Sequence, residues 1–371
     1  MAKDAERKAF KDYFDAAAAR SLAAQVARVH PSFDARAFEA RATRGLKALA
    51  FAARVRQFSD ALRATLPDPP RGIELLRDSL PPALPDTDSV TDGWLQWPIG
   101  QYIADHGLAH FDLSMDAMRE LTMRFSSEFA VRPFVEHRPK ETLSRLRSLT
   151  EDDNPHVRRW CSEGTRPRLP WGKKLRALVE DPSPIFPILE ALRDDPDLYV
   201  RRSVANNLGD IAKDHPDLVL ARCRAWQKNA SAERRWLIAH ALRVPIKNGD
   251  PEALAIIGYG PPKRLRAELT AAPAKVRMGD VVTLSARIET TSSLEQNLLV
   301  DYLVHFRHKR GGSAPKVFKW TKTTLPARGT LELDKRHRMK TTTIRTLYAG
   351  EHRVDLQVNG ERVASTRFRL V

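Results

Sequence analysis

The stretch DDNPHVRRWCSEG, residues 152–164, returns in altered form as DDPDLYVRRSVANNLGD, residues 194–210. The Val-Arg-Arg steps that begin at Val157 and Val200 are 43 residues apart, and a poorer third copy, SAERRWLIAHAL, follows at residues 231–242. A period near 40 residues, with a proline before each helical run, is typical of HEAT-like repeats. Because one such unit cannot bury its apolar face alone, the repeats predict a curved helical solenoid with a long concave groove.

The helical character extends outward from these repeats over residues 1–262. Residues 14–66 are dominated by alanine, leucine and arginine, and their apolar positions recur with a spacing near 3.6. Proline-rich breaks at residues 66–72 and 80–88 mark loops. A non-repeating helical bundle with coincidental Val-Arg-Arg pairs is the alternative to the solenoid.

The pattern changes after IIGYGPPKR, residues 256–264. VVTLSARIE, residues 281–289, and LVDYLVHFRH, residues 299–308, alternate apolar and polar side chains, as half-buried strands do. Asn359-Gly360 is a hairpin signal between two further strands. Residues 263–371 therefore predict a small immunoglobulin-like β-sandwich. The expected protein is multidomain, an all-α HEAT-like solenoid over residues 1–262 followed by this all-β domain.

The charge of the chain points to a polyanionic partner. The net charge is +16, and residues 263–371 alone hold 22 Lys/Arg against 10 Asp/Glu, a net of +12. Residues 119–176 carry a further net of +6. Clustered positive charge of this kind favours nucleic acid.

The cysteine count and the hydropathy pattern bear on the compartment. There are only two cysteines, Cys161 and Cys223, which argues against a disulfide framework and suits a reducing compartment. The charged N-terminus shows no signal peptide, and no apolar run reaches the ~18 residues of a membrane span. The sequence thus predicts a cytoplasmic, nucleoid-associated monomer without membrane contact.

Glu163 stands where a carboxylate is unfavourable by itself. The helix through Val157 is expected to end near Gly164, so Glu163 falls in its last turn. A negative charge there opposes the helix dipole by roughly 0.3–1 kcal/mol. A salt bridge to Arg159 or to Arg166 would explain its presence structurally; a functional role is the other explanation.

Glu128 raises the same question. It follows Leu121 by seven positions and Phe125 by three, so it borders an apolar helical stripe. A carboxylate at such a border is unusual unless it is paired or functional. Pairing with Arg124 or with Arg132, each four residues away, is the structural explanation.

Two more residues carry weaker signals. Asp210 shares a helical face with Asn206 and Asn207, which fits a polar ridge on a repeat helix as well as a site. Trp171 follows Pro170 in a constrained turn and either is exposed or packs over a helix end.

RFSSEFAVRPF at residues 124–134, VRRWCSEGTRPRLPW at 157–171 and DPDLYVRRSVANNLGDIAKDHPDLV at 195–219 together resemble the AlkD/AlkC superfamily of HEAT-like alkylpurine DNA glycosylases. The resemblance is closest to the AlkC branch and covers most of residues 90–260. A helical region followed by an immunoglobulin-like domain also resembles one AlkC subgroup. SEG-x-RPRLPW is the most specific of these motifs.

That family hydrolyses the N-glycosidic bond of cationic alkylated bases such as 3-methyladenine and, in the AlkC branch, 3-methylcytosine, leaving an abasic site. The resemblance implies double-stranded DNA containing alkylated bases as the partner. It also implies roles for particular residues, with Glu163, Glu128 and more weakly Asp210 as catalytic acids, and Trp171, Phe129 and Arg166 as substrate contacts.

The residue types suit this chemistry independently of the resemblance. A cationic base is already a good leaving group, so a fixed carboxylate needs only to stabilise an oxocarbenium-like sugar and aim a water. An aromatic face can hold the cation. Basic side chains can grip phosphates; the predicted set is Arg158, Arg159, Arg168, Lys173, Lys174, Arg201, Arg202, Lys309 and Arg310.

His110, His137 and His156 show neither a cysteine cluster nor helical pair spacing, so we expect no metal and no cofactor. Lys173 and Lys174 give no sign of a depressed pKa, which favours a monofunctional hydrolase. The alternative class of function is a HEAT-repeat scaffold that binds nucleic acid without catalysis. Capture of the lesion by base flipping or without flipping stays open.

Overall fold

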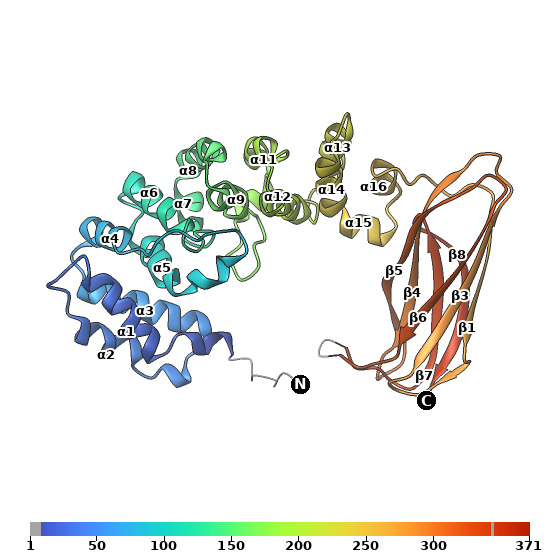
Figure 1. The fold of residues 1–371 in the computed structure, drawn as a ribbon, viewed down its shortest axis with the longest axis horizontal. Helices are drawn as coiled ribbons and strands as arrows, with labels where there is room; N and C mark the ends of the chain where they lie inside the picture. The colour runs from blue at the N-terminus through green and yellow to red at the C-terminus, as the bar shows by residue number, and fades with distance from the viewer. Residues whose placement is uncertain (1–8, 343–344) are drawn as a thin grey trace. The chain divides into compact units, whose positions relative to one another are not determined.

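The computed structural model describes residues 9–342 and 345–371, apart from the side chains of residues 90–92 (Figure 1). Helices come first and strands follow, with the change between Ile256 and Leu265. This order confirms the predicted fold class, a repeat-like helical region followed by a small all-β domain.

The helices are short and are joined by short loops. The described residues form sixteen α-helices: α1 Ala16–Ala27, α2 Ala35–Thr43, α3 Phe51–Thr65, α4 Pro69–Asp78, α5 Trp97–His106, α6 Phe111–Thr122, α7 Arg132–His137, α8 Pro139–Ser148, α9 Pro155–Glu163, α10 Arg176–Glu180, α11 Phe186–Leu192, α12 Leu198–Ile211, α13 Pro216–Gln227, α14 Ala232–Ala241, α15 Arg243–Asn248 and α16 Pro251–Ile256. Short 3₁₀ turns add η1 Phe10–Tyr13, η2 Leu46–Ala48, η3 Ser89–Gln96, η4 Leu149–Glu151 and η5 Ser183–Ile185.

The two best copies of the repeat form α9 and α12, which pack together. Asn154 caps α9 by accepting a hydrogen bond from the His156 amide at 2.9 Å, and Pro155 occupies the first helical turn, where its missing N–H is harmless. Asn207 of α12 donates a hydrogen bond to the Ser162 carbonyl at 2.8 Å. This contact fixes the C-terminal end of α9 against the middle of α12.

The predicted apolar stripe through Phe125 and Phe129 is not one helix. Helix α6 ends at Thr122 and α7 begins at Arg132, so Glu128 lies in the intervening turn. The serines between them compete for backbone groups. The Ser127 hydroxyl donates to the Met118 carbonyl at 2.7 Å and thereby helps end α6.

The β domain is a two-sheet sandwich. Its strands are β1 Leu265–Ala272, β2 Lys275–Val276, β3 Val281–Thr290, β4 Gln296–Arg307, β5 Ser313–Leu325, β6 Thr330–Arg338, β7 Gly350–Val358 and β8 Glu361–Leu370. One sheet has the order β1-β3-β6 and the other the order β2-β8-β7-β4-β5.

The side chains that the alternation placed inside the sandwich are indeed buried between the sheets, among them Val282, Leu284, Val300 and Tyr302. The predicted Asn-Gly turn joins β7 to β8. Asn359 and Gly360 both have positive φ, 47° and 86°, as a tight hairpin requires.

The compact units divide at a different place from the change of secondary structure. Contacts cluster into Met1–Pro216 and Asp217–Val371, so α13 to α16 belong with the sandwich. Two close contacts link the segments after α15 and α16 to the turn between β7 and β8. Asn359 donates to the Gly260 carbonyl at 2.8 Å, and a Cβ on Gly249 would lie only 2.8 Å from the Gly360 carbonyl oxygen.

Candidate active site

A cavity of about 310 Å³ opens in the first unit, and its wall combines aromatic rings with two carboxylates. Its aromatic residues come from segments far apart in the sequence, and its charged residues come from α9 and the adjoining turns. The lining residues are Phe10, Trp94, Trp97, Phe125, Ser126, Glu128, Phe129, Arg159, Glu163, Arg166, Leu169, Pro170 and Trp171.

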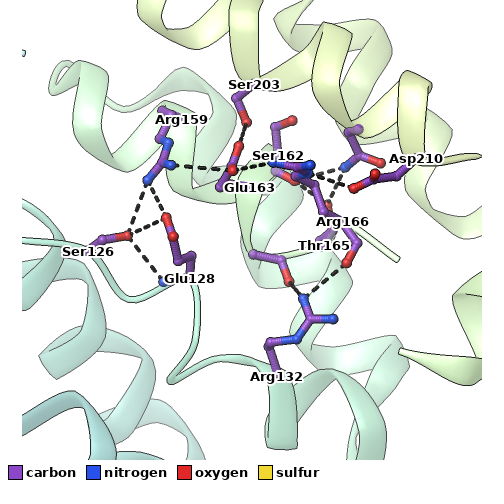
Figure 2. A network of polar contacts seen from close by, with 12 residues as sticks. Ser126, Glu128, Arg132, Arg159, Ser162, Glu163, Thr165, Arg166, Ser203 and Asp210 are labelled. Carbon is purple, nitrogen blue, oxygen red and sulfur yellow. Dashed lines mark hydrogen bonds and ion pairs between the residues drawn. The ribbon is translucent and has the colours of Figure 1, made fainter. Parts of the chain in front are cut away.

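Glu163 is the last residue of α9, as predicted, and only 6% of it is exposed (Figure 2). Both proposed salt bridges exist at once, to Arg166 Nη1 at 2.6 Å and to Arg159 Nη2 at 3.4 Å. Ser203 of α12 donates a third contact to the other carboxylate oxygen at 2.6 Å. Both oxygens of Glu163 are therefore engaged.

These partners decide the charge of Glu163. Burial alone would raise the pKa of this carboxyl group, but Arg159 and Arg166, together with the Ser203 hydroxyl, outweigh burial and hold the pKa below its ordinary value. Arg159 responds in the opposite sense: burial would lower its pKa, while Glu128 and Glu163 raise it. Glu163 is thus a fixed negative charge.

Glu128 reaches the same cavity from the turn between α6 and α7. Its partner is Arg159 from α9, rather than Arg124 or Arg132, and the Ser126 hydroxyl also donates to it at 2.9 Å. Both contacts are made to Oε2, so among the described residues no group donates a hydrogen bond to Oε1. One oxygen of Glu128 therefore remains available toward the cavity.

Arg159 joins the two acids. Its guanidinium pairs with Glu128 and Glu163 and lies 5.3 Å from the ring centre of Tyr199. The prediction had placed Arg159 among the phosphate contacts. With 16% of its side chain exposed and both acids as partners, its role in the structure is to hold the acids.

Asp210 lies behind this cluster and does not line the cavity. It accepts from Arg166 Nε at 2.8 Å and from Lys213 Nζ at 2.8 Å. Arg166 thereby bridges Asp210 of α12 and Glu163 of α9. Asp210 therefore reaches the cavity's charged residues by direct contact with Arg166.

Trp171 is exposed, with 84% of its surface open, and its φ is +64°. A left-handed backbone at a bulky residue is strained by about 1–3 kcal/mol, and such strain gathers at functional sites. The loop that carries it is held from beneath by buried Arg132, whose guanidinium donates to the carbonyls of Lys173 at 2.6 Å and Arg166 at 3.0 Å. The ring is therefore exposed on a braced loop.

The predicted substrate contact Phe129 also lies on the wall, where it stacks on Trp97 with centroids 4.9 Å apart and planes at 15°. The sequence did not single out Phe10, Trp94 or Trp97. They lie outside the repeat motifs, and only their aromatic type could have suggested them.

The other predicted phosphate contacts divide into two groups. Arg158 and Arg201 point inward: Arg158 pairs with Asp195 and Asp197, and Arg201 donates to the Asp195 and Pro196 carbonyls. Arg158 thereby joins the two repeat loops and Arg201 holds the loop before its own helix, while a contact of either with DNA phosphates stays a prediction.

The remaining cations are closer to solvent. Arg168 pairs with Asp214 and Lys173 with Glu136, whereas Lys174 and Arg202 are exposed. Lys309 and Arg310 occupy the exposed turn between β4 and β5.

A search of the described residues for three or more His, Cys, Asp or Glu side chains able to share a metal ion finds no such group. The helices of that same part of the chain are each too short or too polar to cross a membrane.

Comparison with known proteins gives two family matches. Residues 122–244 match the family described as DNA alkylation repair enzyme. Residues 266–371 match the C-terminal Ig-like domain of the uncharacterised protein YhaZ. The first match covers the helices that build the cavity's charged wall, and the second covers the sandwich.

Two relatives extend over more of the chain. Protein YhaZ of Bacillus subtilis (strain 168), itself uncharacterised, is 39% identical over 270 residues, which is 72% of this chain and 75% of YhaZ. Among solved structures, the chain is similar to the Pseudomonas fluorescens alkylpurine DNA glycosylase AlkC bound to DNA containing an abasic site analogue. That similarity has a TM-score of 0.88 and 35% identity, and it covers 98% of this chain and 99% of the other.

Proposed function

The chain belongs to the DNA alkylation repair enzymes, in the AlkC-like branch that ends in an Ig-like domain, and from this premise we propose that it releases cationic alkylated bases of the 3-methyladenine and 3-methylcytosine type. It is a DNA glycosylase, and DNA is its partner. The proposed substrate is duplex DNA bound by one copy of the chain, and the proposed product is an abasic site.

One observation supports this proposal above the others. Two glutamates share the wall of an aromatic cavity, and one arginine, Arg159, holds both. An ordinary structural ion pair needs no aromatic cavity beside it. A cationic base, in contrast, is attracted by both features, since carboxylates and aromatic faces each stabilise a nearby positive charge.

The reaction breaks the bond between C1′ of the deoxyribose and the base nitrogen. The bonding electrons leave with the base and cancel its positive charge, while the sugar develops oxocarbenium character. Water then attacks C1′ and gives up a proton. A fixed negative charge near the sugar lowers the energy of that transition state, because the positive charge moves from the base onto the sugar.

The contacts suggest different tasks for the two glutamates. Glu128 has Oε1 unengaged by the described residues, so it is the better group to orient the water and accept its proton. Glu163 has both oxygens engaged and supplies the fixed charge. Asp210 acts through Arg166 as a positioning residue.

Positive surfaces suggest where DNA phosphates bind. On the first unit, exposed Lys174 and Arg202 are candidates. On the sandwich, a hollow of about 500 Å³ is lined by four cations, Lys275, Arg277, Arg336 and Arg338, and by the carboxylate of Asp280. The turn with Lys309 and Arg310 lies at the same end of the sandwich as this hollow. The strand pairings show this, because Arg307 at the end of β4 and Leu370 at the end of β8 both lie at that end.

The test is release of methylated bases from alkylated duplex DNA under single-turnover conditions. We expect Glu128→Gln to lower the rate by about 10²-fold or more, because it removes both the proton acceptor and a charge. Glu163→Gln should also lower it. Glu120→Gln is the matched control, since Glu120 pairs with Arg124 and Arg119 and does not line the cavity.

The products provide a second check. A monofunctional glycosylase leaves the strand intact until alkali cleaves it at the abasic site. Wild-type protein that binds methylated duplex but releases no base would support the scaffold alternative instead.

A further inference from the structure

Phe10 brings an aromatic ring to the cavity from the opposite end of the first unit's sequence. It belongs to η1, lines the cavity and is 45% exposed. Its ring centre lies 6.3 Å from that of Trp171, and the two planes meet at 43°. Two exposed rings from distant segments thus lie next to each other at the rim of the cavity that holds Glu128 and Glu163.

The Phe10 ring is supported from behind, and the loop that carries Trp171 is braced. Phe10 contacts Phe51 with centroids 4.8 Å apart, and Phe51 in turn contacts Trp97, 5.0 Å away, within the aromatic wall. Trp171 stands on the loop that Arg132 braces. Supported aromatic side chains are able to bind a planar group with little loss of their own freedom.

The spacing of the two rings suits one inserted plane. Stacked bases are about 3.4 Å apart, so a base held between two rings needs about 6.8 Å between them. The observed 6.3 Å at 43° is neither a close stack nor an edge-to-face pair. A base would enter once the two rings turned parallel and faced each other across about 6.8 Å.

We propose that Phe10 and Trp171 form a two-sided stacking site for one nucleobase at the rim of the cavity. This rests on the proposed function, because it assumes that DNA reaches the cavity. The occupant is recognised by its planar π face, which every base has. It is either the target base itself or the base beside it in the strand.

A charged target base would stack more strongly than the neutral base that leaves. The rings attract a cation through their faces, and this attraction is lost once the glycosidic electrons neutralise the base. A stacking site at this position would therefore hold the substrate more tightly than the released product.

The test begins with Phe10→Leu, which keeps the apolar bulk and removes the π face. Single-turnover release of 3-methyladenine from methylated duplex should fall about tenfold, the loss that removing one stacking contact with a base produces. Phe10→Tyr should restore the rate to about the wild-type value, because it restores the face. Phe111→Leu, the same substitution at a ring of the first unit outside the cavity lining, should leave the rate unchanged.

The double variant Phe10→Leu/Trp171→Leu tests whether the two rings act on the same base. Either single change removes one face of the two-ring stacking site. The fold-loss of rate in the double variant should therefore be smaller than the product of the two single fold-losses. Effects that multiply would overturn the proposal. So would a wild-type rate in Phe10→Leu, or a failure of Phe10→Tyr to restore it.

Binding to duplex that carries an abasic-site analogue identifies the occupant. If Phe10→Leu binds this duplex as tightly as wild type, the occupant is the target base; a weaker affinity indicates the neighbouring base. Wild-type protein inert on methylated DNA would contradict the proposed function. In that case only binding to the abasic duplex tests the stacking site, and an unchanged affinity of Phe10→Leu for that duplex overturns the proposal.

Discussion

At the scale of single residues, Glu163 combines deep burial with a permanent charge. Two arginines and a hydroxyl surround its carboxylate, and they keep its pKa below the ordinary value although burial acts in the other direction. A charge fixed in this way needs no reorganisation when a cation forms beside it.

The pH dependence of stability should reveal this charge. Because the folded-state pKa is depressed, ionised Glu163 stabilises the fold at every pH above its ordinary value of 4.5 and stops doing so as pH falls below it. Urea unfolding of wild type and Glu163→Gln should therefore give a constant difference in unfolding free energy from pH 8 to about 5. The difference should shrink only at lower pH.

If the wild type instead gained stability relative to Glu163→Gln between pH 7 and 5.5, burial would outweigh the arginines and the pKa of Glu163 would be raised. Glu120→Gln, a change outside the cavity, should alter the unfolding free energy only slightly at every pH, because the ion pairs of Glu120 lie near the surface.

The sequence could identify the acids of the cavity wall but only some of their partners. The pairs of Glu163 with Arg159 and Arg166 follow from helical spacing alone. The pair of Glu128 with Arg159, and the contact of Ser203 with Glu163, join segments that meet only through helix packing. Helical spacing therefore predicts one of the two acids that Arg159 contacts, and a contact of Arg159 with DNA phosphates stays a prediction.

At the scale of elements, the loop from Gly164 to Lys173 depends on one buried side chain. Arg132 donates to the carbonyls of Lys173, Arg166 and, more distantly at 3.4 Å, Gly164. Burial lowers the pKa of Arg132 to about 10, so it stays charged at neutral pH. The Arg132 guanidinium thus supplies hydrogen bonds that regular secondary structure would otherwise give to the carbonyls of this loop.

Arg132→Lys should loosen this loop, since an ammonium cannot match the planar fork of a guanidinium. We expect a loss of about 1–3 kcal/mol in unfolding free energy and faster hydrogen exchange at the Gly172 and Leu175 amides. Arg124→Lys, on the turn before, is the control. Unchanged hydrogen exchange at both amides would mean that the loop keeps its structure without the contacts of Arg132.

Strand β4 carries a second unusual carboxylate. Asp301 is 3% exposed, and burial raises its pKa to about 6 despite Lys319, Lys322 and Lys247 nearby. Its Oδ1 has no hydrogen-bond partner among the described groups. Ionised Asp301 is therefore a cost to the sandwich at neutral pH.

Asp301→Asn should stabilise the protein at pH 8 by roughly 1–3 kcal/mol. The sign follows from the raised pKa: wild type is relieved of this cost below pH 3.8 and meets it in full as pH rises through 6. The gain in melting temperature should therefore be smaller at pH 5 than at pH 8. Asp355→Asn should destabilise instead, because Arg353 and His305 bind that carboxylate.

Regular strands were easier to predict than the turn beside α6. In β3 every second residue enters the core, and the sequence shows that alternation directly. Between Leu121 and Phe129 the apolar spacing fits a continued helix, but the hydroxyls of Ser126 and Ser127 take over backbone and carboxylate contacts. Apolar spacing contains no information about that competition.

At the scale of the whole molecule, one end of the sandwich carries the hollow lined by Lys275, Arg277, Arg336 and Arg338. Arg336→Gln/Arg338→Gln should weaken binding to duplex DNA and reduce the slope of log affinity against log salt by up to about 2, one unit for each lost phosphate contact. Lys263→Gln/Arg328→Gln is the control at the opposite end, where Leu265 pairs with Thr290. Equal losses in both variants would mean that net charge alone matters.

The grouping of α13 to α16 with the sandwich bears on how this architecture can be recombined. A gene fragment cut where the strands begin would separate Asn359 from the Gly260 carbonyl and part Gly360 from Gly249. An exchange of the β module between proteins that keeps these contacts would therefore carry preceding helices with it. The transferable segment begins near residue 217, well before the first strand.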